Sequence, residues 1–403
     1  MLVTAVSRAC TFVLVLHHEL VRAQYTVAKD YHGQGFFTGW NFYGSWDNLT
    51  QGDVNYLTQS QAAAQRLTYV NDAGNAVIRV DNFTNVSSNE KRNSIRIESK
   101  DTYSVGSLWI IDAVHLPFGC SVWPAFWSKG DDWPNGGEID IIEGINLLGR
   151  NQVALHTTPG CFKHDVAGTQ SGQTIGSNCS VDAGCVVGET RPNSYGSGFA
   201  QAGGGVFATQ LDVSGIYVWF WTRAAIPQSI RSSSNTSNLN ISDWGMPSAA
   251  YPSTSCNITQ LFSVQRLVLD ITLCGVWAGV PGIYNSTCAN TGATGLCYND
   301  NVIGPGSPKY DNAYFEIPFI RAYTVAASPP AASAAPKLPS INPLSTSTGT
   351  ESSGHVTVII TPPTARPINS ASTDTLARFR AMWLQHGSLT MVISVLGSAP
   401  FFL

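Results

Sequence analysis

Hydrophobic residues recur along the chain in short runs in which apolar and polar positions alternate or the apolar positions are continuous. Such runs are NAVIRVDN, NSIRIESK, GIYVWFWTR, RLVLDITLCG and NAYFEIPFIRAYT. Alternation at every second residue is typical of β-strands with one buried face. Gly, Asn, Pro and Ser separate the runs, and no stretch keeps a helical period. The pattern predicts one all-β domain at residues 24–325, built from two packed antiparallel sheets as a sandwich or jelly roll.

The two ends of the chain differ from this domain in composition. Residues 1–23 hold an apolar stretch and end in VRA, which predicts a cleaved secretory signal peptide. Residues 326–370 are rich in Ala, Pro, Ser and Thr, the composition of an extended, O-glycosylated stalk. Residues 371–403 resemble a GPI-attachment signal that would tether the protein to a membrane or cell wall. The alternative is a disordered tail with an apolar end.

Composition narrows the choice of partners. Only 12% of the residues are charged and the formal net charge is -4, which argues against a nucleic acid or an anionic membrane as partner. The chain has 11 Trp and 14 Tyr. These rings either pack in the core or stack on flat, partly apolar ligands such as sugars.

Cysteines and glycosylation sequons indicate an extracellular protein. Removal of a signal peptide takes away Cys10 and leaves an even set of cysteines, for which disulfides are expected although their pairing is open. A high density of N-x-S/T sequons fits the same compartment. The sequon asparagines are Asn48, Asn82, Asn85, Asn178, Asn235, Asn240, Asn257 and Asn285.

The segment PNGGEIDIIEGIN, residues 134–146, places three acids close together on an isoleucine-rich strand. On a regular strand Glu138 and Asp140 share one face, whereas Glu143 points to the opposite, apolar face. A carboxylate buried there without a partner costs several kcal/mol. A single β-bulge at Ile141 and Ile142 shifts the phase and returns Glu143 to the acidic face. We therefore expect all three acids on one side of a bulged strand.

The spacing of Glu138 and Glu143 suits a retaining glycosidase. With the bulge their Cα atoms lie ~13 Å apart, and side chains that lean toward each other bring the carboxyls to ~5 Å. At that separation one carboxylate attacks the anomeric carbon while the other donates a proton. Asp140 between them can hydrogen-bond one carboxyl and hold the two pKa values apart. The alternatives are a calcium site and a solvated edge strand.

These residues and their flanks resemble glycoside hydrolase family 16. GEIDIIEG matches the E-x-D-x-x-E signature, and HLPFGCSVWPAFWSKGDDWPNGGEIDIIEGIN and ALHTTPGC resemble the fungal laminarinase-like endo-1,3(4)-β-glucanases of that family. The resemblance implies a β-jelly-roll with an open concave cleft and retention of anomeric configuration, with neither cofactor nor metal. By the family pattern Glu138 is the nucleophile, Asp140 its assistant and Glu143 the general acid/base.

The resemblance also implies polar substrate contacts. His156 would lie on the adjacent strand near the acid/base, as a neutral imidazole that donates to a carboxylate or a sugar oxygen. Arg92 stands where the family usually reads R-x-S and would reach the cleft, although a solvated surface arginine is the alternative. Val276 departs from the pattern, because related sequences commonly carry an acid there. This departure puts one polar contact at the cleft wall in doubt.

Tryptophans are the expected sugar platforms. By the resemblance Trp127, Trp133 and Trp277 would present indole faces to the axial C–H face of a pyranose. Trp123, beside Pro124, is as easily a core residue. A histidine or tryptophan on an apolar strand is often structural, so these assignments depend on the family pattern.

Three functions from different classes fit the sequence. The first is an endo-acting hydrolase of β-1,3 or mixed β-1,3/1,4-glucan, the second a cell-wall glucan transglycosylase, and the third a non-catalytic β-glucan-binding protein. Family transglycosylases of fungal walls generally have an unbulged E-x-D-x-E pattern, and non-catalytic relatives usually lose the glutamates. We therefore expect a secreted or surface-anchored, monomeric, retaining endo-β-glucanase whose partner is the polysaccharide substrate.

Overall fold

The computed structural model describes residues 24–325. The predicted signal peptide, stalk and attachment tail lie outside the described residues and stay predictions. Within residues 24–325 the longest helix has eight residues, and none is long and apolar enough to cross a membrane.

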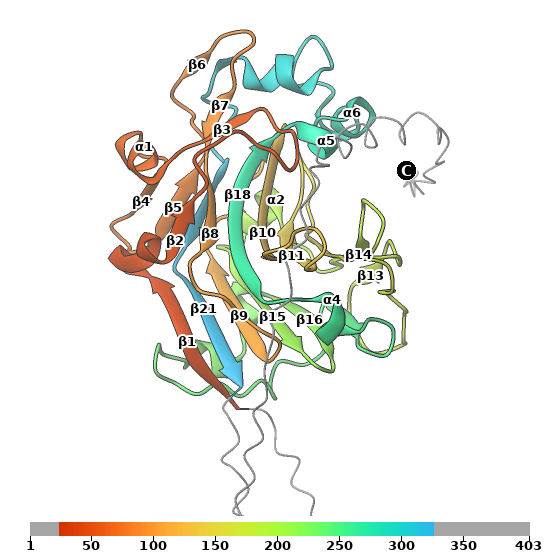
Figure 1. Cartoon of the computed structure of the whole chain (residues 1–403). Coiled ribbons are helices and arrows are strands. Elements are labelled where there is room, and N and C mark those ends of the chain that lie inside the picture. Colours follow the sequence, from red (N-terminus) through yellow and green to blue (C-terminus); the bar gives the residue numbers. More distant parts are fainter. Residues whose placement is uncertain (1–23, 326–403) are drawn as a thin grey trace, which may run out of the picture. The chain divides into compact units, whose positions relative to one another are not determined.

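Two antiparallel sheets form the body of the domain and confirm the predicted all-β jelly-roll (Figure 1). The larger sheet has eight strands in the order β13 (Gln173–Thr174), β14 (Cys185–Gly188), β12 (Gln152–His156), β11 (Glu138–Glu143), β10 (Val122–Gly130), β18 (Gln265–Leu273), β8 (Arg96–Ser99) and β2 (Trp40–Phe42). The smaller has six strands in the order β1 (Tyr25–His32), β21 (Phe319–Val325), β9 (Ser107–Ala113), β15 (Gly205–Asp212), β16 (Gly215–Thr222) and β17 (Ala249–Pro252).

Shorter elements close the ends of the two sheets. Small sheets are formed by β19 (Gly304–Pro305) with β6 (Asn85–Val86), by β20 (Tyr314–Ile317), β5 (Ala76–Arg79) and β4 (Thr68–Val70), and by the parallel pair β3 (Val54–Tyr56) and β7 (Arg92–Ser94). The α-helices are α1 (Gln59–Ala64), α2 (Gly196–Gln201), α3 (Gln228–Arg231), α4 (Ile258–Leu261), α5 (Gly275–Ala278) and α6 (Pro281–Cys288). Tighter or wider helical turns are η1 (Gly33–Gly39), η2 (Arg223–Ala225) and η3 (Tyr298–Val302).

The main hydrophobic core draws side chains from both large sheets. Trp109 and Phe207 of the six-stranded sheet belong to the same buried cluster as Ile97, Phe126 and Leu269 of the eight-stranded sheet. Each of these side chains is at most 1% exposed. Because side chains alternate along a strand, the neighbours of these residues point to the outer faces of the sheets.

A separate aromatic cluster covers the outer face of the six-stranded sheet. Trp219 and Trp221 of β16 lie parallel with ring centres 6.5 Å apart, and Trp244 packs edge-on against both at 5.2 Å. All three are at most 7% exposed. These tryptophans therefore serve packing, not ligand binding.

The predicted strands are present, but two of the predicted runs each divide between sheets. The run NSIRIESK is divided between β7 and β8, which belong to different sheets. The run NAYFEIPFIRAYT forms two strands, β20 and β21, which belong to different sheets. Pro318 lies between them, and proline has no backbone N–H with which to continue a sheet ladder. The chain therefore changes sheets at this residue.

All eight cysteines of the described domain are in disulfides, which confirms the expected disulfide-bonded domain. The pairs are Cys120–Cys288, Cys161–Cys256, Cys179–Cys185 and Cys274–Cys297. The eight sequon asparagines are exposed or half-buried, so each reaches the surface. Glycosylation itself stays a prediction.

The first and last strands of the domain are neighbours. β1 pairs antiparallel with β21, from Tyr25 opposite Val325 to His32 opposite Phe319. β21 also pairs with β9 on its other side, whereas β1 is the outer strand of the sheet. The two ends of the described chain therefore meet at one sheet edge (Figure 1).

Candidate active site

β11 carries the bulge that the sequence predicts. Between Asp140 and Glu143 this strand has two residues, whereas the paired stretch of β12 has one. The two residues, Ile141 and Ile142, are both fully buried in the main core. The extra residue returns Glu143 to the face that carries Glu138 and Asp140. We call this side of the eight-stranded sheet the acid face.

Asn151 holds the bulge open with its side chain. Its Nδ2 donates to the carbonyl of Ile141 at 2.9 Å, and its Oδ1 accepts from the backbone N–H of Glu143 at 3.0 Å. The side chain is 1% exposed, and its own backbone N–H donates to Ser194 Oγ at 3.0 Å. Sequence reasoning missed Asn151, because no local pattern shows which residue will satisfy the groups that a bulge leaves unpaired.

His156 lies on the adjacent strand, as expected, and its charge acts on Glu143. It pairs with Glu138, not with Glu143, and its Nε2 lies 3.3 Å from Oδ2 of the buried Asp140. That oxygen makes no hydrogen bond of good geometry, so the contact is an ion pair. Burial lowers the pKa of His156, but Asp140, Glu138 and Glu143 outweigh this effect and raise it to about 9. The expectation of a neutral imidazole is therefore wrong at neutral pH.

The same three side chains have the atoms of a metal site. One oxygen each from Glu138 and Asp140 and a ring nitrogen of His156 lie within 4.8 Å of one another. A protonated imidazole, however, has no lone pair to offer a cation. Since the pKa of His156 is raised to about 9, a cation that binds here would have to displace a proton from the imidazole.

Gly184 leaves the space that His156 occupies. Its φ is +67°, and a Cβ atom there would lie 2.8 Å from both Cε1 and Nε2 of the imidazole. Gly184 belongs to the short loop closed by the Cys179–Cys185 disulfide. The N–H of Thr157 donates to the carbonyl of Cys179 at 2.9 Å, which attaches that loop to the end of β12. The loop thus confines the ring at its Cε1–Nε2 edge.

Each glutamate accepts a hydrogen bond from an indole. Trp133 Nε1 donates to Oε2 of Glu138, and Trp123 Nε1 donates to Oε1 of Glu143 at 2.9 Å. Trp123 is 9% exposed and packs edge-on against Trp277, with ring centres 5.3 Å apart. Trp123 is therefore a positioning residue of the acid face, not a core residue between the sheets.

Burial sets the protonation of the two glutamates. Burial and the charge of Asp140 raise the pKa of Glu138, the charge of His156 and the indole hydrogen bond lower it, and the result is about 8. The pKa of Glu143 is raised well above its ordinary value, mainly by burial and by Asp140. Burial thus favours the protonated form of both glutamates, and the charge of His156 opposes it in both. The predicted carboxyl separation of ~5 Å stays a prediction.

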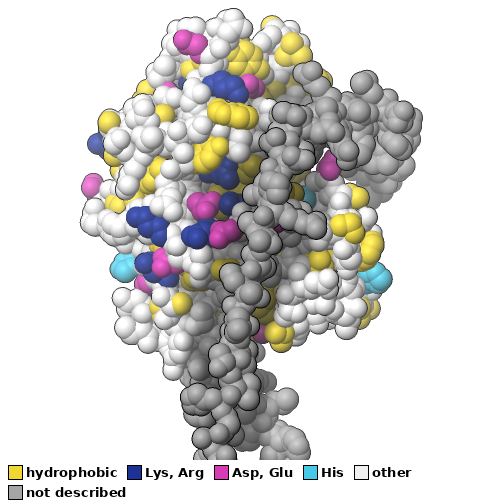
Figure 2. Space-filling model, in the orientation of Figure 1, with side chains coloured by type: hydrophobic (Ala, Val, Ile, Leu, Met, Phe, Trp, Pro, Cys, Tyr) yellow, Lys and Arg dark blue, Asp and Glu magenta, His cyan; other side chains and the backbone are white. Residues whose placement is uncertain are grey.

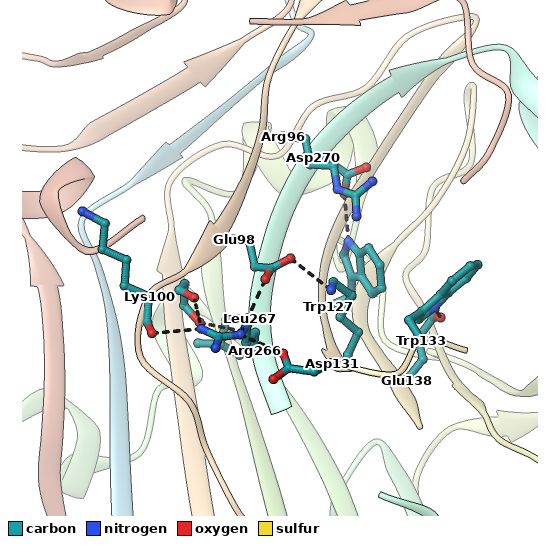
Figure 3. Close-up of polar contacts among 12 residues, drawn as sticks. Arg96, Glu98, Lys100, Trp127, Asp131, Trp133, Glu138, Arg266, Leu267 and Asp270 are labelled. Atoms are coloured by element: carbon teal, nitrogen blue, oxygen red, sulfur yellow. Dashed lines mark hydrogen bonds and ion pairs between the residues drawn. The ribbon is translucent and has the colours of Figure 1, made fainter. Parts of the chain in front are cut away.

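The predicted tryptophan platforms differ in how much of the ring they offer. Trp133 is 36% exposed and stands next to Glu138 (Figure 3). Trp277 is half-buried beside Trp123. Trp127 lies on the acid face but is only 5% exposed, and its Nε1 donates to Asp270 at 2.9 Å. Trp133 and Trp277 thus expose ring surface on which a sugar can stack, whereas Trp127 exposes little of its ring.

The prediction that Arg92 reaches the acid face is wrong. Arg92 is fully buried, and its guanidinium lies 4.8 Å from the ring centre of Tyr310. It donates four hydrogen bonds of 2.7–3.0 Å to backbone carbonyls, those of Asp81, Thr84, Val302 and Gly304. Arg92 therefore ties together segments far apart in the chain and contacts no substrate surface.

Sequence reasoning missed a second cluster of charged side chains on the acid face, which contains Arg96 and Asp270. The Arg96 guanidinium lies 4.7 Å from the ring centre of Tyr43 and 5.8 Å from that of Trp127. Asp270 accepts from Trp127 and, at 3.3 Å, from the hydroxyl of Tyr56, and burial raises its pKa to about 6. Figure 3 shows this group beside Trp127, on the side away from Glu138. The signal was a lone acid within the apolar run RLVLDITL.

Ion pairs extend the polar surface along β8, β10 and β18. Glu98 pairs with Lys129 at 3.1 Å and with Arg266 at 3.6 Å, and Arg266 also pairs with Asp131 at 2.9 Å. Basic and acidic side chains lie next to one another near the middle of the view in Figure 2. The acid face therefore carries balanced charge, which suits a neutral, hydroxyl-rich ligand.

The fold and this site together define a class of protein. A β-jelly-roll sheet bears two glutamates with raised pKa values on one bulged strand, and indole rings border them. Two carboxyl groups on one face beside indole rings are the equipment of a glycosidase.

Comparison with known proteins identifies the family. The domain described as the XgeA-like, catalytic GH16 domain matches residues 40–323. The chain therefore belongs to glycoside hydrolase family 16, which confirms the resemblance that its motifs indicated.

Relatives and solved structures agree with this assignment. A probable glycosidase of Schizosaccharomyces pombe is 39% identical over 74% of this chain and 69% of its own length. A probable endo-1,3(4)-β-glucanase of Aspergillus fumigatus is 38% identical over 74% of this chain but only 45% of its own length. The chain thus spans less than half of several curated relatives that it matches.

Two solved structures share the fold closely. Laminarinase 16A from Phanerochaete chrysosporium, solved with two β-glucans in donor and acceptor sites, is 35% identical with a TM-score of 0.69 over 75% of this chain and 100% of its own. An elongating family 16 β-1,3-glucosyltransferase is 38% identical with a TM-score of 0.68, over 74% of this chain and 100% of its own.

Proposed function

We propose that this protein is a retaining endo-β-glucanase that cleaves internal bonds of β-1,3 or mixed β-1,3/1,4-glucan. The observation that carries the proposal is the bulge of β11, which sets Glu138 and Glu143 on one face of the sheet. The named activities of the matched relatives, endo-1,3(4)-β-glucanase and laminarinase, support the substrate class.

In the first step the bond to the leaving sugar breaks. The carboxylate of Glu138 attacks the anomeric carbon, and the protonated carboxyl of Glu143 gives its proton to the glycosidic oxygen. The indole of Trp133 holds Oε2 of Glu138, which leaves Oε1 free to attack. The positive charge of His156, opposite Glu138, favours the ionised nucleophile.

In the second step water releases the sugar. The carboxylate of Glu143 takes a proton from water, and the resulting nucleophile attacks the anomeric carbon and frees Glu138. Two inversions at one carbon give net retention. Burial and, after it, the charge of Asp140 raise the pKa of Glu143, which favours the protonated acid that the first step needs.

Product analysis tests this function. Laminarin, lichenan and a β-1,4-linked glucan would each be digested, and the anomeric proton of the first product would be followed by NMR. We expect internal cleavage of laminarin or lichenan with a β-anomer that later mutarotates. An α-anomer as first product, or no cleavage of any β-glucan, would refute the proposal.

A second candidate activity is glycosyl transfer between glucan chains. The specific support is the 38% identity and TM-score of 0.68 to a family 16 β-1,3-glucosyltransferase. Both activities share the first step and differ only in whether water or a sugar hydroxyl attacks the intermediate. Addition of a labelled acceptor oligosaccharide to the same digestion separates them, because only transfer lengthens the acceptor.

We also propose that the protein acts outside the cell. Four disulfides and eight surface sequons support an oxidising, secretory environment. A variant that ends after Ser370 should appear in the medium with unchanged specific activity if residues 371–403 direct a surface anchor. A full-length chain found soluble with its C-terminus intact would exclude that anchor.

A further inference from the structure

Phe83 holds a phenyl ring in solvent, away from the acid face. Its side chain is 66% exposed, the largest value for any large hydrophobic side chain within residues 24–325. The residue lies just before β6, which pairs with β19 in a two-stranded sheet that is separate from the eight-stranded sheet. The ring therefore offers apolar area that another group could cover.

The backbone that carries this ring is fixed from below. Oδ1 of Asp81 accepts the backbone N–H groups of Phe83 at 2.8 Å and of Thr84 at 3.0 Å. The guanidinium of the buried Arg92 donates to the carbonyls of Asp81 and Thr84, each at 3.0 Å. Because the segment is already ordered, a group that packs on the ring pays little conformational entropy.

One neighbour also fixes the ring itself. The guanidinium of Arg79, on β5, lies over Phe83 at 5.1 Å from the ring centre. A cation at this distance is attracted to the face of an aromatic ring. Since the side chain is still 66% exposed, the contact leaves most of the ring open to an apolar partner.

Two glycosylation sequons overlap in this segment, NFT at 82–84 and NVS at 85–87. Asn85 is exposed, so its amide is accessible to a sugar. Asn82 is half-buried, and its Nδ2 donates to Oδ1 of Asp311 at 2.6 Å. A glycan on Asn82 would have to fit beside that carboxylate, and Asn85 is therefore the better acceptor in the folded protein.

We propose that Asn85 carries an N-linked glycan whose first sugar packs on the ring of Phe83, an inference that rests on the proposed extracellular location. Cα atoms two residues apart are separated by at most about 7 Å, which is within reach of a sugar ring joined to the Asn85 amide. The apolar C–H face of a pyranose suits an aromatic face. The glycan would thus cover the exposed ring and stabilise the fold.

The modification needs a lipid-pyrophosphate-linked oligosaccharide as donor, which the secretory path supplies. The bond from C1 of the first N-acetylglucosamine to the pyrophosphate oxygen breaks, and a bond from C1 to Nδ2 of Asn85 forms. The amide loses one proton, and the lipid pyrophosphate leaves with it. Atoms and charge balance, and no oxidant or reductant takes part.

Three variants separate the sugar from the ring. Ser87→Ala removes the sequon of Asn85, leaves that asparagine in place and keeps the backbone hydrogen bond of residue 87. The matched control Thr84→Val removes the sequon of Asn82 with a side chain of the same shape. Phe83→Ala removes the ring and leaves both sequons intact.

The full-length chain and its variants would be produced in a glycosylating host and studied by peptide mass spectrometry and thermal melting. We expect a glycan on Asn85, and a Tm about 1–3 °C lower in Ser87→Ala than in the parent, whereas Thr84→Val should match the parent. In the Phe83→Ala background the effect of Ser87→Ala should fall by at least half. Trimming the parent glycan to its first N-acetylglucosamine should keep the higher Tm, because that sugar makes the contact.

Three outcomes would overturn the proposal. The first is an unmodified Asn85 in a protein whose other sequons are occupied. The second is a Tm in Ser87→Ala equal to that of the parent. The third is an equal loss of Tm from Ser87→Ala with and without the ring of Phe83. A secreted protein with no glycan at any sequon would refute this inference alone, whereas a chain that never enters the secretory path would refute the proposed location and this inference with it.

Discussion

Replacing Glu138 with glutamine should abolish turnover and at the same time make the domain more stable at neutral pH. Burial and the charge of Asp140 raise the pKa of Glu138 from 4.5 to about 8 in the folded protein. The unfolded chain therefore releases this proton near pH 4.5, while the folded chain keeps it up to about pH 8. An acid with a raised pKa costs stability as pH rises through that window. Glutamine has no proton to release.

The size of the gain follows from the same shift. Each pH unit between 4.5 and 7 lowers the free energy of unfolding of the parent by up to 1.36 kcal/mol, which sets an upper limit of about 3 kcal/mol at pH 7. Solvent reaches part of the Glu138 side chain, and its titration is coupled to those of its acidic neighbours. We therefore expect about 1–2 kcal/mol, or roughly 2–6 °C in Tm.

The assay is thermal melting of parent and Glu138→Gln from pH 4 to pH 9, followed by circular dichroism. The difference in Tm should be absent near pH 4, grow up to pH 7 and level off above about pH 8. The control is Glu98→Gln on the same face, whose parent carboxylate pairs with Lys129 and Arg266 and which should gain nothing at pH 7. A Glu138→Gln protein that melts no higher than the parent at pH 7 would refute the reasoning. Retention of a tenth of the activity would reassign the nucleophile.

Three further changes test other parts of the site. Deletion of Ile142 keeps the three acids on one face at two-residue spacing, so it should lower the free energy of unfolding by ~1–3 kcal/mol and leave weak but detectable laminarin hydrolysis. An alanine inserted between Ile141 and Ile142 should abolish hydrolysis. A folded, fully active insertion variant would contradict the claim that Glu138 and Glu143 act as a pair at a fixed separation. Gly184→Ala should displace His156, lower its pKa from about 9 and reduce kcat about tenfold with KM nearly unchanged. An NMR titration of His156 that is unaltered in this variant would contradict the role of Gly184 in holding the ring. Arg92→Lys should lower the free energy of unfolding by about 2–3 kcal/mol without changing KM, and a raised KM at unchanged Tm would return this residue to substrate binding.

Features set by neighbours along the chain could be predicted from the sequence. The strands and the bulge follow from alternation, because a regular strand would have buried Glu143 among isoleucines. The structure has Ile141 and Ile142 both in the core, as that argument requires. The acidic cluster could therefore be predicted from a segment of six residues.

Features set by pairing between distant segments could not be predicted in the same way. Arg92 and Arg96 lie in one polar-apolar run, and only the assignment of β7 and β8 to different sheets decides which of them reaches the acid face. The partner of His156 depends on the register of β12, which the connecting loop does not fix. Its charge in turn depends on that register, since Asp140 raises its pKa.

The pairing of β1 with β21 has a consequence for how the chain matures. Tyr25 is among the first residues of the domain to be synthesised, and its partner Val325 is the last residue described. β1 is the outer strand of its sheet and pairs within it only with β21, so it waits for nearly the whole domain to be made. Until then its hydrogen-bonding edge is open to other chains. A chain that ends before residue 319 therefore lacks the strand with which β1 pairs in its sheet.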